Sequence, residues 1–114
     1  MNRVVAQASA TKARALFSEG ISLHQAGRLA DAQAIYRQLL GLFPGQPDAL
    51  HMLGVSEFQS RNYAEAVRLI GEAGKQLPNN DLVQFNLGNA YRALGQLDQA
   101  SVAFRKAVRL RPDN

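Results

Sequence analysis

The chain has 114 residues, a mass of 12.4 kDa and 46% hydrophobic residues, which suits one domain with a hydrophobic core. It contains no cysteine, which excludes disulfides, thiolate metal ligands and cysteine nucleophiles. The formal charge of +4 is too mild for a committed nucleic-acid binder, and no apolar run approaches the roughly 18 residues of a membrane span. The residues before Ala8-Ser9-Ala10 include too few apolar ones for a signal peptide, so we expect a soluble, cytoplasmic protein.

Three residue types recur at a spacing of 34 positions, without insertion. They are glycines, alanines and prolines: Gly20, Gly54 and Gly88; Ala32, Ala66 and Ala100; Pro44, Pro78 and Pro112. The spacing divides the chain into repeats at 13–46, 47–80 and 81–114, preceded by residues 1–12 as a lead-in or an extension of the first helix. Unit positions are counted from the first residue of each repeat, so that residues 13, 47 and 81 are at unit position 1.

Within each repeat the apolar residues recur every three or four positions, which predicts two helices and no strand. In chain order, the expected helices are 10–26, 29–43, 48–60, 63–77, 81–94 and 97–111. Gly27 and Gly95 can close first helices in the left-handed conformation, and the proline at unit position 32 stops each second helix. Asp48 and Asp81 can cap or charge the first turn of the helix that follows.

The glycine at unit position 8 falls in the middle of a helix, where it costs about 1 kcal/mol against alanine. Its recurrence indicates that the paired helix passes too close for a Cβ, with the alanine at unit position 20 as the matching small residue. The large residues Tyr36, Ile70 and Phe104 are then expected to fill the space between one pair and the next. Because one helix pair cannot bury its apolar stripe alone, the pairs must stack.

These markers resemble the tetratricopeptide repeat family, whose units carry Leu-Gly at positions 7–8, aromatic residues at 11 and 24, and alanine at 20 and 27. The third repeat matches most closely, with Leu87, Gly88, Tyr91, Ala100, Phe104, Ala107 and Pro112. The second repeat departs at Glu57 and Ile70, and the first has Glu19 in place of leucine. The resemblance covers residues 13–114 and implies an all-α fold, a right-handed superhelical solenoid of three antiparallel helix pairs and six helices.

By the same resemblance, the first helices line a concave groove, into which unit positions 5, 9 and 12 point; their spacing also places them on one helix face. These positions, together with one asparagine at position 6, hold Phe17, Ile21, His24, His51, Val55, Phe58, Phe85, Asn86, Asn89 and Arg92. Five of them are large and apolar, which favours a binding surface over one that neighbouring helices or residues 1–12 cover. We therefore expect a non-catalytic protein–protein interaction module that binds a protein or peptide segment with apolar side chains, with Asn86 and Asn89 holding a backbone amide.

Two ligand classes of the family fit poorly. Members that bind the carboxyl-terminal tails of heat-shock chaperones use a clamp of lysine, asparagine and arginine, but the matching residues here are Phe17, Ile21, Met52, Leu82 and Asn86. Relatives attached to O-linked N-acetylglucosamine transferases carry an asparagine at unit position 6 of each repeat. Here that series is Ser18, Met52 and Asn86, a single asparagine.

Nothing in the sequence indicates catalysis. The chain has two histidines, His24 and His51, with no carboxylate at ligand spacing, and it lacks a phosphate-binding loop and a nucleophile motif. We expect no metal and no cofactor. The densest charge cluster comprises Arg105, Lys106, Arg109 and Arg111. It lies in the last turns of a helix, where cations complement the helix dipole, so nucleic-acid binding is not expected.

The sequence stops at a repeat boundary, which leaves Phe104, Val108 and Leu110 without a following helix. Two explanations are open. The chain is the amino-terminal repeat segment of a larger bacterial glycosyltransferase- or sulfotransferase-like enzyme, used for substrate recruitment or self-association, or it forms a homo-oligomer through this uncapped face.

The predicted helix 63–77 contains two further glycines, Gly71 and Gly74, where helix formers are expected. Close approach by a neighbour or local tolerance explains them most simply. A flexible joint in the superhelix is the alternative.

Overall fold

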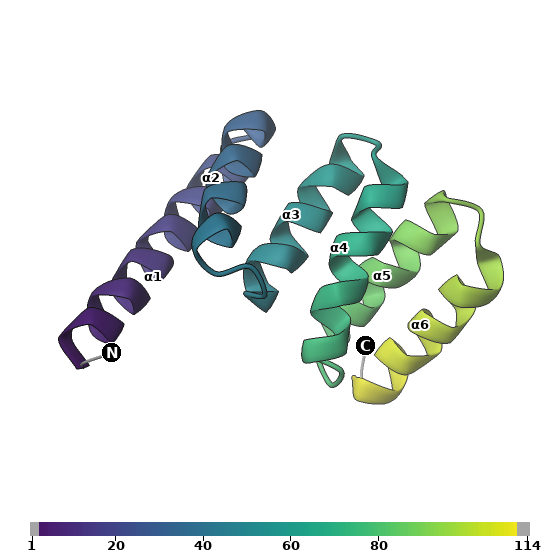
Figure 1. Ribbon diagram of the computed structural model, residues 1–114. Coiled ribbons are helices and arrows are strands. Elements are labelled where there is room, and N and C mark those ends of the chain that lie inside the picture. The colour runs from purple at the N-terminus through teal and green to yellow at the C-terminus, as the bar shows by residue number, and fades with distance from the viewer. Residues whose placement is uncertain (1–2, 112–114) are drawn as a thin grey trace.

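The computed structural model describes residues 3–111, which form helices and turns without a strand. The helices are α1 (Arg3–Gln25), α2 (Leu29–Leu42), α3 (Pro47–Gln59), α4 (Tyr63–Gln76), α5 (Asp81–Ala93) and α6 (Leu97–Leu110). They form three antiparallel pairs, stacked one after another along the molecule (Figure 1). Each pair contacts the next chiefly through α2 with α3 and α4 with α5. The molecule is therefore elongated, with extents of 46 × 28 × 23 Å.

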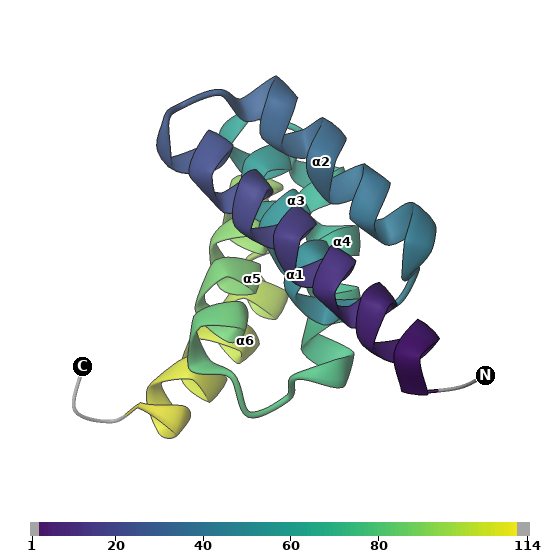
Figure 2. The ribbon, with the colours of Figure 1, turned by 90° about the vertical axis from the view of Figure 1, so that its left-hand side faces the viewer.

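Five helices begin and end within about one residue of the predicted bounds, but α1 starts at Arg3 rather than at residue 10. Residues 3–12 continue α1 in a straight line away from the stack (Figure 2). They therefore do not fold back over the face of the first helices. Pro112, at the end of the third repeat, lies outside the described residues. No described helix has both the length and the hydropathy needed to cross a membrane.

The helix ends combine predicted and unpredicted residues. Gly27 and Gly95 have φ of 79° and 84°, as expected for glycines that close a helix, and Arg61 takes the same left-handed place after α3 with φ of 67°. Gln46 and Asn80 supply the side-chain caps of α3 and α5, accepting from the backbone N–H groups three residues on at 2.6 and 3.0 Å. The two aspartates predicted at these ends stand in the first turns, beside the positive end of the helix dipole.

The glycines at unit position 8 are packed against large side chains of their own pair. A Cβ built on each glycine would clash with the side chain at unit position 24 of the same pair. The distances would be 2.5 Å from Gly20 to Tyr36, 2.5 Å from Gly54 to Ile70 and 2.6 Å from Gly88 to Phe104. The prediction of a close approach is confirmed, and the matching role of the alanines at unit position 20 stays a prediction. The large residue at unit position 24 of the paired helix occupies the space that a Cβ would fill.

The two further glycines of α4 differ from each other. A Cβ on Gly74 would lie 3.4 Å from Gln84 and 3.7 Å from Val83 of the next pair, which fits a close approach by a neighbour. A Cβ on Gly71 would meet nothing within 4 Å. The flexible joint stays a prediction.

Gly54→Ala and Gly71→Ala form a matched pair of tests. The first is expected to lower the free energy of unfolding by about 1–3 kcal/mol, because the new methyl group must displace Ile70 and neighbouring backbone. The second adds a methyl group into open space in the same repeat and should raise the free energy of unfolding by up to about 1 kcal/mol. Urea denaturation measures both. Changes of the same sign and size would contradict the packing role of Gly54.

Candidate functional site

The predicted groove residues lie on the first helices, and their apolar members are only partly available. Phe17, Ile21, Val55 and Phe58 are half-buried and pack against the hydrophobic core. The rings of Phe17 and Phe58 also contact tyrosines of their own pairs, with centroid distances of 6.3 and 5.4 Å. Phe85, by contrast, is 49% exposed. The apolar surface of α1 and α3 is thus a set of half-exposed side chains that both hold the stack together and face solvent.

Both histidines connect consecutive first helices. His24 Nε2 donates to Gln59 Oε1 at 2.5 Å, while its Nδ1 accepts from the Tyr36 hydroxyl at 3.2 Å. His51 Nε2 accepts from Asn86 Nδ2 at 2.9 Å. Each histidine therefore bonds to a side chain 35 residues further on, one repeat plus one residue. Neither pairing was predicted, because the partners stand at unequal unit positions of successive repeats, 12 with 13 and 5 with 6.

Burial shifts the pKa of two groups that take part in these hydrogen bonds, the His51 ring and the Tyr36 hydroxyl. His51 is 7% exposed, and burial lowers its pKa, opposed in part by the nearby Asp48 carboxylate. Burial raises the pKa of Tyr36 to about 12, so its hydroxyl stays a hydrogen-bond donor at neutral pH. Neutral His51 can accept from Asn86 through Nε2 only when its proton is on Nδ1. In the part of the chain that the structure describes, no group of three or more His, Asp or Glu residues is placed to hold a metal ion.

The lowered pKa of His51 predicts a loss of stability in mild acid. The unfolded chain takes up the proton near the usual histidine pKa of 6.5, whereas the folded chain takes it up at lower pH. The contribution of His51 is therefore fully present above about pH 6.5 and declines as the pH falls below it. Urea denaturation between about pH 7.5 and pH 5 should show a smaller decline for His51→Gln, which keeps an acceptor for Asn86 but does not titrate. An unchanged pH dependence would refute this role.

Two asparagines of α5 each keep one polar atom without a partner among the described residues. Asn86 uses its Nδ2 for His51, which leaves its Oδ1 as an acceptor. Asn89 accepts from Arg92 Nη2 through its Oδ1 at 2.9 Å, which leaves its Nδ2 as a donor. The Arg92 guanidinium also lies 5.5 Å from the centre of the Phe104 ring. One acceptor and one donor on the same helix face match the two polar groups of a peptide bond.

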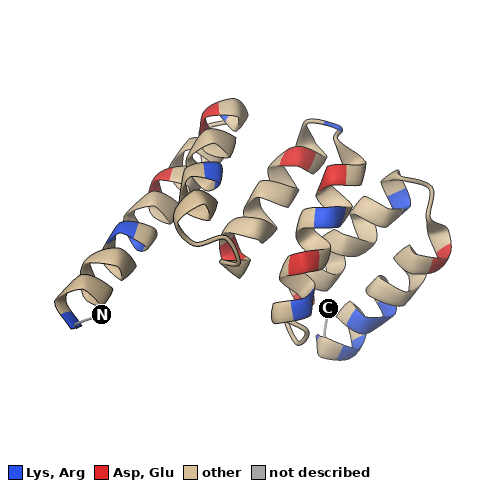
Figure 3. Ribbon diagram, viewed as in Figure 1, with Lys and Arg blue, Asp and Glu red and all other residues tan. Residues whose placement is uncertain are grey.

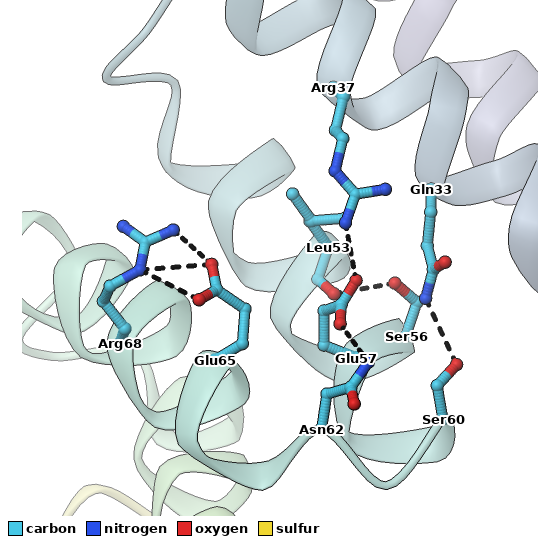
Figure 4. A network of polar contacts seen from close by, with 9 residues as sticks. All are labelled: Gln33, Arg37, Leu53, Ser56, Glu57, Ser60, Asn62, Glu65 and Arg68. Atoms are coloured by element: carbon cyan, nitrogen blue, oxygen red, sulfur yellow. Dashed lines mark hydrogen bonds and ion pairs between the residues drawn. The ribbon is translucent and has the colours of Figure 1, made fainter.

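A buried glutamate joins the first pair to the second (Figure 4). Glu57 is only 4% exposed; its carboxylate accepts from Arg37 Nη2 of α2 at 2.7 Å and from Asn62 Nδ2 at 2.8 Å. Gln33 adds a second link from α2, donating to the Ser60 hydroxyl at 3.3 Å. Glu57 stands where the family has an aromatic residue. The sequence contains a signal for this ion pair: Glu57 places a charge at a position that is usually apolar, and Arg37 stands at unit position 25 of the preceding repeat.

Removal of the arginine tests the buried pair. Arg37→Met is expected to lower the free energy of unfolding by about 1–3 kcal/mol, because it leaves the buried Glu57 carboxylate without its cation. Arg37→Met combined with Glu57→Leu should recover most of that loss, since an apolar residue then fills the position. Thermal or urea unfolding gives both values. A double variant no more stable than Arg37→Met alone would argue against this account.

The carboxyl-terminal pair has an open apolar face. A hollow of about 510 Å³ lies between α5 and α6, and its lining residues are Asp81, Leu82, Phe85, Phe104, Ala107, Val108 and Arg111. Leu82 and Val108 are 55% and 59% exposed, and no described residue covers them. The Phe85 and Phe104 rings, both part of the lining, have centroids 5.8 Å apart. Of the residues predicted for the uncapped face, Phe104 and Val108 line this hollow, whereas Leu110 is half-buried and does not.

Cations gather beside this face. Figure 3 shows blue segments concentrated along α6, which carries Arg105, Lys106 and Arg109. Arg111 at the end of the helix pairs with Asp81, with 3.5 Å between Nη1 and Oδ2. The open face is thus lined mainly by apolar residues, and positive charge gathers on its α6 side.

Comparisons with known proteins agree with this architecture. Two family models described as tetratricopeptide repeat match residues 23–84 and 82–114. Anaphase-promoting complex subunit 7 from Homo sapiens is 31% identical over 94 residues, which cover 82% of this chain and 16% of the relative. The chain thus spans about a sixth of the length of the curated relatives that it matches.

Solved structures match over nearly the whole chain. MamA from Desulfovibrio magneticus RS-1 has a TM-score of 0.85 and 25% identity, over 90% of this chain and 58% of its own. An O-GlcNAc transferase variant from Thermobaculum terrenum has a TM-score of 0.89 and 27% identity, over 99% of this chain and 21% of its own. The first TPR of Spaghetti (RPAP3), bound to the HSP90 peptide SRMEEVD, has a TM-score of 0.87 but 21% identity, over 91% of this chain and 82% of its own, and so shows likeness of fold alone.

Proposed function

Because the chain belongs to the tetratricopeptide repeat family, we propose that it is a non-catalytic module that binds a protein or peptide segment along the groove of its first helices. The observation that carries the proposal is the row of half-exposed apolar side chains on α1 and α3, continued on α5 by two asparagines with free polar atoms. The apolar residues anchor side chains of the bound segment, and the asparagines hold one of its peptide bonds. The proposed contact residues are Phe17, Ile21, His24, His51, Val55, Phe58, Phe85, Asn86, Asn89 and Arg92.

The chemistry of the groove favours an apolar ligand over an acidic tail. Spaghetti is a relative in fold that binds an HSP90 peptide with two glutamates and an aspartate. The positions that resemble the family's cationic clamp hold Phe17, Ile21, Met52, Leu82 and Asn86 here, without a cation. Two basic residues of the groove, His51 and Arg92, are both engaged with asparagines. A carboxylate at the clamp positions would therefore lose hydration without gaining an ion pair from the residues that stand there.

Peptides selected from a random phage-displayed library on the full chain test the groove. We expect them to share apolar residues at a regular spacing. Phe58→Ala should weaken their binding by about tenfold or more in calorimetry, as at an anchor residue of an interface. Gln38→Ala, on the exposed face of α2, is the matched control and should leave the affinity unchanged. Circular dichroism confirms that each variant is folded. If Phe58→Ala and Asn89→Ala bind the selected peptides as the unaltered chain does, the groove assignment is wrong.

A second candidate function follows from the lengths of the relatives. The Thermobaculum terrenum O-GlcNAc transferase aligns with 99% of this chain over 21% of its own length. By analogy, the chain would be the repeat segment of a larger bacterial glycosyltransferase- or sulfotransferase-like enzyme, used for substrate recruitment or self-association. The complete reading frame decides whether a catalytic domain follows, and light scattering at rising concentration decides whether copies associate. A stop codon directly after Asn114 would remove this candidate.

A further inference from the structure

Another hollow lies away from both the groove and the open face of the third pair. It has a volume of about 380 Å³, and its lining residues on α5 and α6 are Gln84, Leu87, Tyr91, Asp98, Gln99, Val102, Ala103 and Lys106. None of them belongs to the proposed groove or to the open face. Gln84 places the hollow beside α4, because its side-chain nitrogen would lie 3.4 Å from a Cβ on Gly74. The hollow is thus at the junction of the second and third pairs.

This side of a second helix stays exposed wherever the pair stands in the stack. Asp98 and Val102, the exposed α6 residues of the lining, stand at unit positions 18 and 22. Residues at these positions are exposed in the other two pairs as well, although a further pair follows each: Ala30, Ala34, Ala64 and Arg68. A following pair therefore leaves this side of a second helix open.

At the first junction an arginine fills the corresponding space. Arg37, at unit position 25, donates to Glu57 at unit position 11 of the next repeat. Its charge also reaches Glu65 at unit position 19, whose pKa is lowered chiefly by the hydrogen bond from Arg68 and further by Arg37. In the third repeat, the residues at unit positions 11 and 19 both line the hollow. Unit position 25 before them is Gly71, on which a Cβ would meet nothing within 4 Å, so the glycine leaves this space open.

The lining includes a buried amide without a partner. Gln84 is 5% exposed and stands at unit position 4, where the other repeats have Leu16 and Leu50. Its side chain forms no hydrogen bond with any described residue. Every fully enclosed side-chain nitrogen or oxygen of the described residues has a partner, so the Gln84 amide must reach the hollow that it lines. A donor and an acceptor are thus available there, next to the apolar Leu87 and Val102.

Two opposite charges line the same hollow. Asp98 and Lys106 form no ion pair with another described residue. They are eight residues apart on α6, which is about 12 Å along a helix, and Val102 stands midway between them. An extended chain covers about 13 Å in four residues, and its side chains at i, i+2 and i+4 share one face. The hollow therefore matches a short extended segment in length and in charge.

We propose that this hollow binds an extended segment of another protein that has opposite charges at i and i+4 and an apolar residue at i+2. The basic residue of the segment pairs with Asp98 and the acidic residue with Lys106, while the apolar side chain packs against Leu87 and Val102. Gln84 donates to and accepts from one peptide bond of the segment. The inference goes beyond the proposed function, because it concerns a different side of α5 and does not depend on the groove.

A second copy of the chain is the poorer occupant. The turns between the described helices have at most four residues, at 43–46 and 77–80. The proposed segment needs five extended residues with alternating side chains, which these turns do not supply.

Two defined peptides test the site, because they present the same residues in opposite order: acetyl-Lys-Ser-Leu-Ser-Glu-amide and acetyl-Glu-Ser-Leu-Ser-Lys-amide. In NMR titrations of the isotope-labelled full chain, one of them should cause saturable shifts of the Gln84 side-chain amide and of the backbone around Val102. It should bind about fivefold or more tightly than the other. Asp98→Lys combined with Lys106→Glu should reverse this preference, which a merely structural effect of the substitutions would not do.

Gln84→Leu gives a second readout. It introduces the leucine that the other repeats have, so the variant should unfold at a higher urea concentration and yet bind the preferred peptide about fivefold or more weakly. Lys75→Glu changes an exposed charge of α4 outside the hollow and should leave the affinity within about twofold.

Three results would overturn the inference. They are the absence of saturable shifts at the hollow with either peptide, an unchanged preference in the double charge variant, and full affinity in Gln84→Leu. Shifts confined to Phe58 and Asn89 would place the peptides in the groove, which supports the groove proposal and contradicts this one. The two proposals therefore fail separately.

Discussion

Each helix pair depends on the contact between a glycine in its first helix and a large side chain in its second. The missing Cβ lets Tyr36, Ile70 or Phe104 lie directly against the backbone of the opposite helix. The large residue then reaches across the pair and enters the surface on which the next pair packs, as Tyr36 and Ile70 do in the main core cluster. One contact thus sets both the spacing within a pair and the apolar surface between pairs. The stack is the repetition of this contact.

Polar contacts complement this packing where consecutive pairs meet. The first and second pairs share the Arg37–Glu57 ion pair and the His24–Gln59 hydrogen bond, and the second and third share the His51–Asn86 bond. Apolar surface alone permits sliding of one helix along another, whereas a hydrogen bond has one geometry. The half-buried groove side chains and these polar bonds lie on the same helices. A ligand in the groove would therefore contact the residues that fix the register of the pairs.

The sequence determined the helices well because its evidence for them was periodic. Glycine, alanine and proline at intervals of 34 residues, with glycines at helix ends, specify local structure that tertiary contacts hardly alter. The start of α1 was missed because the residues before position 10 are mostly exposed and lack an amphipathic stripe. The contacts of Glu57, His24 and His51 were missed for another reason. They join residues of different repeats at unequal unit positions, which depends on how the pairs are offset, and no pattern within one repeat records that offset.

The bonds of the two histidines show that the two junctions of the stack are alike. Each runs from one first helix to a residue one repeat plus one position later. Successive first helices present opposite faces to each other, so residues at unequal unit positions are the ones that meet across a junction. Because the same difference of one position recurs, the third pair is set against the second as the second is set against the first. A single junction therefore serves as the template for the next, which is how a row of helix pairs becomes a regular solenoid.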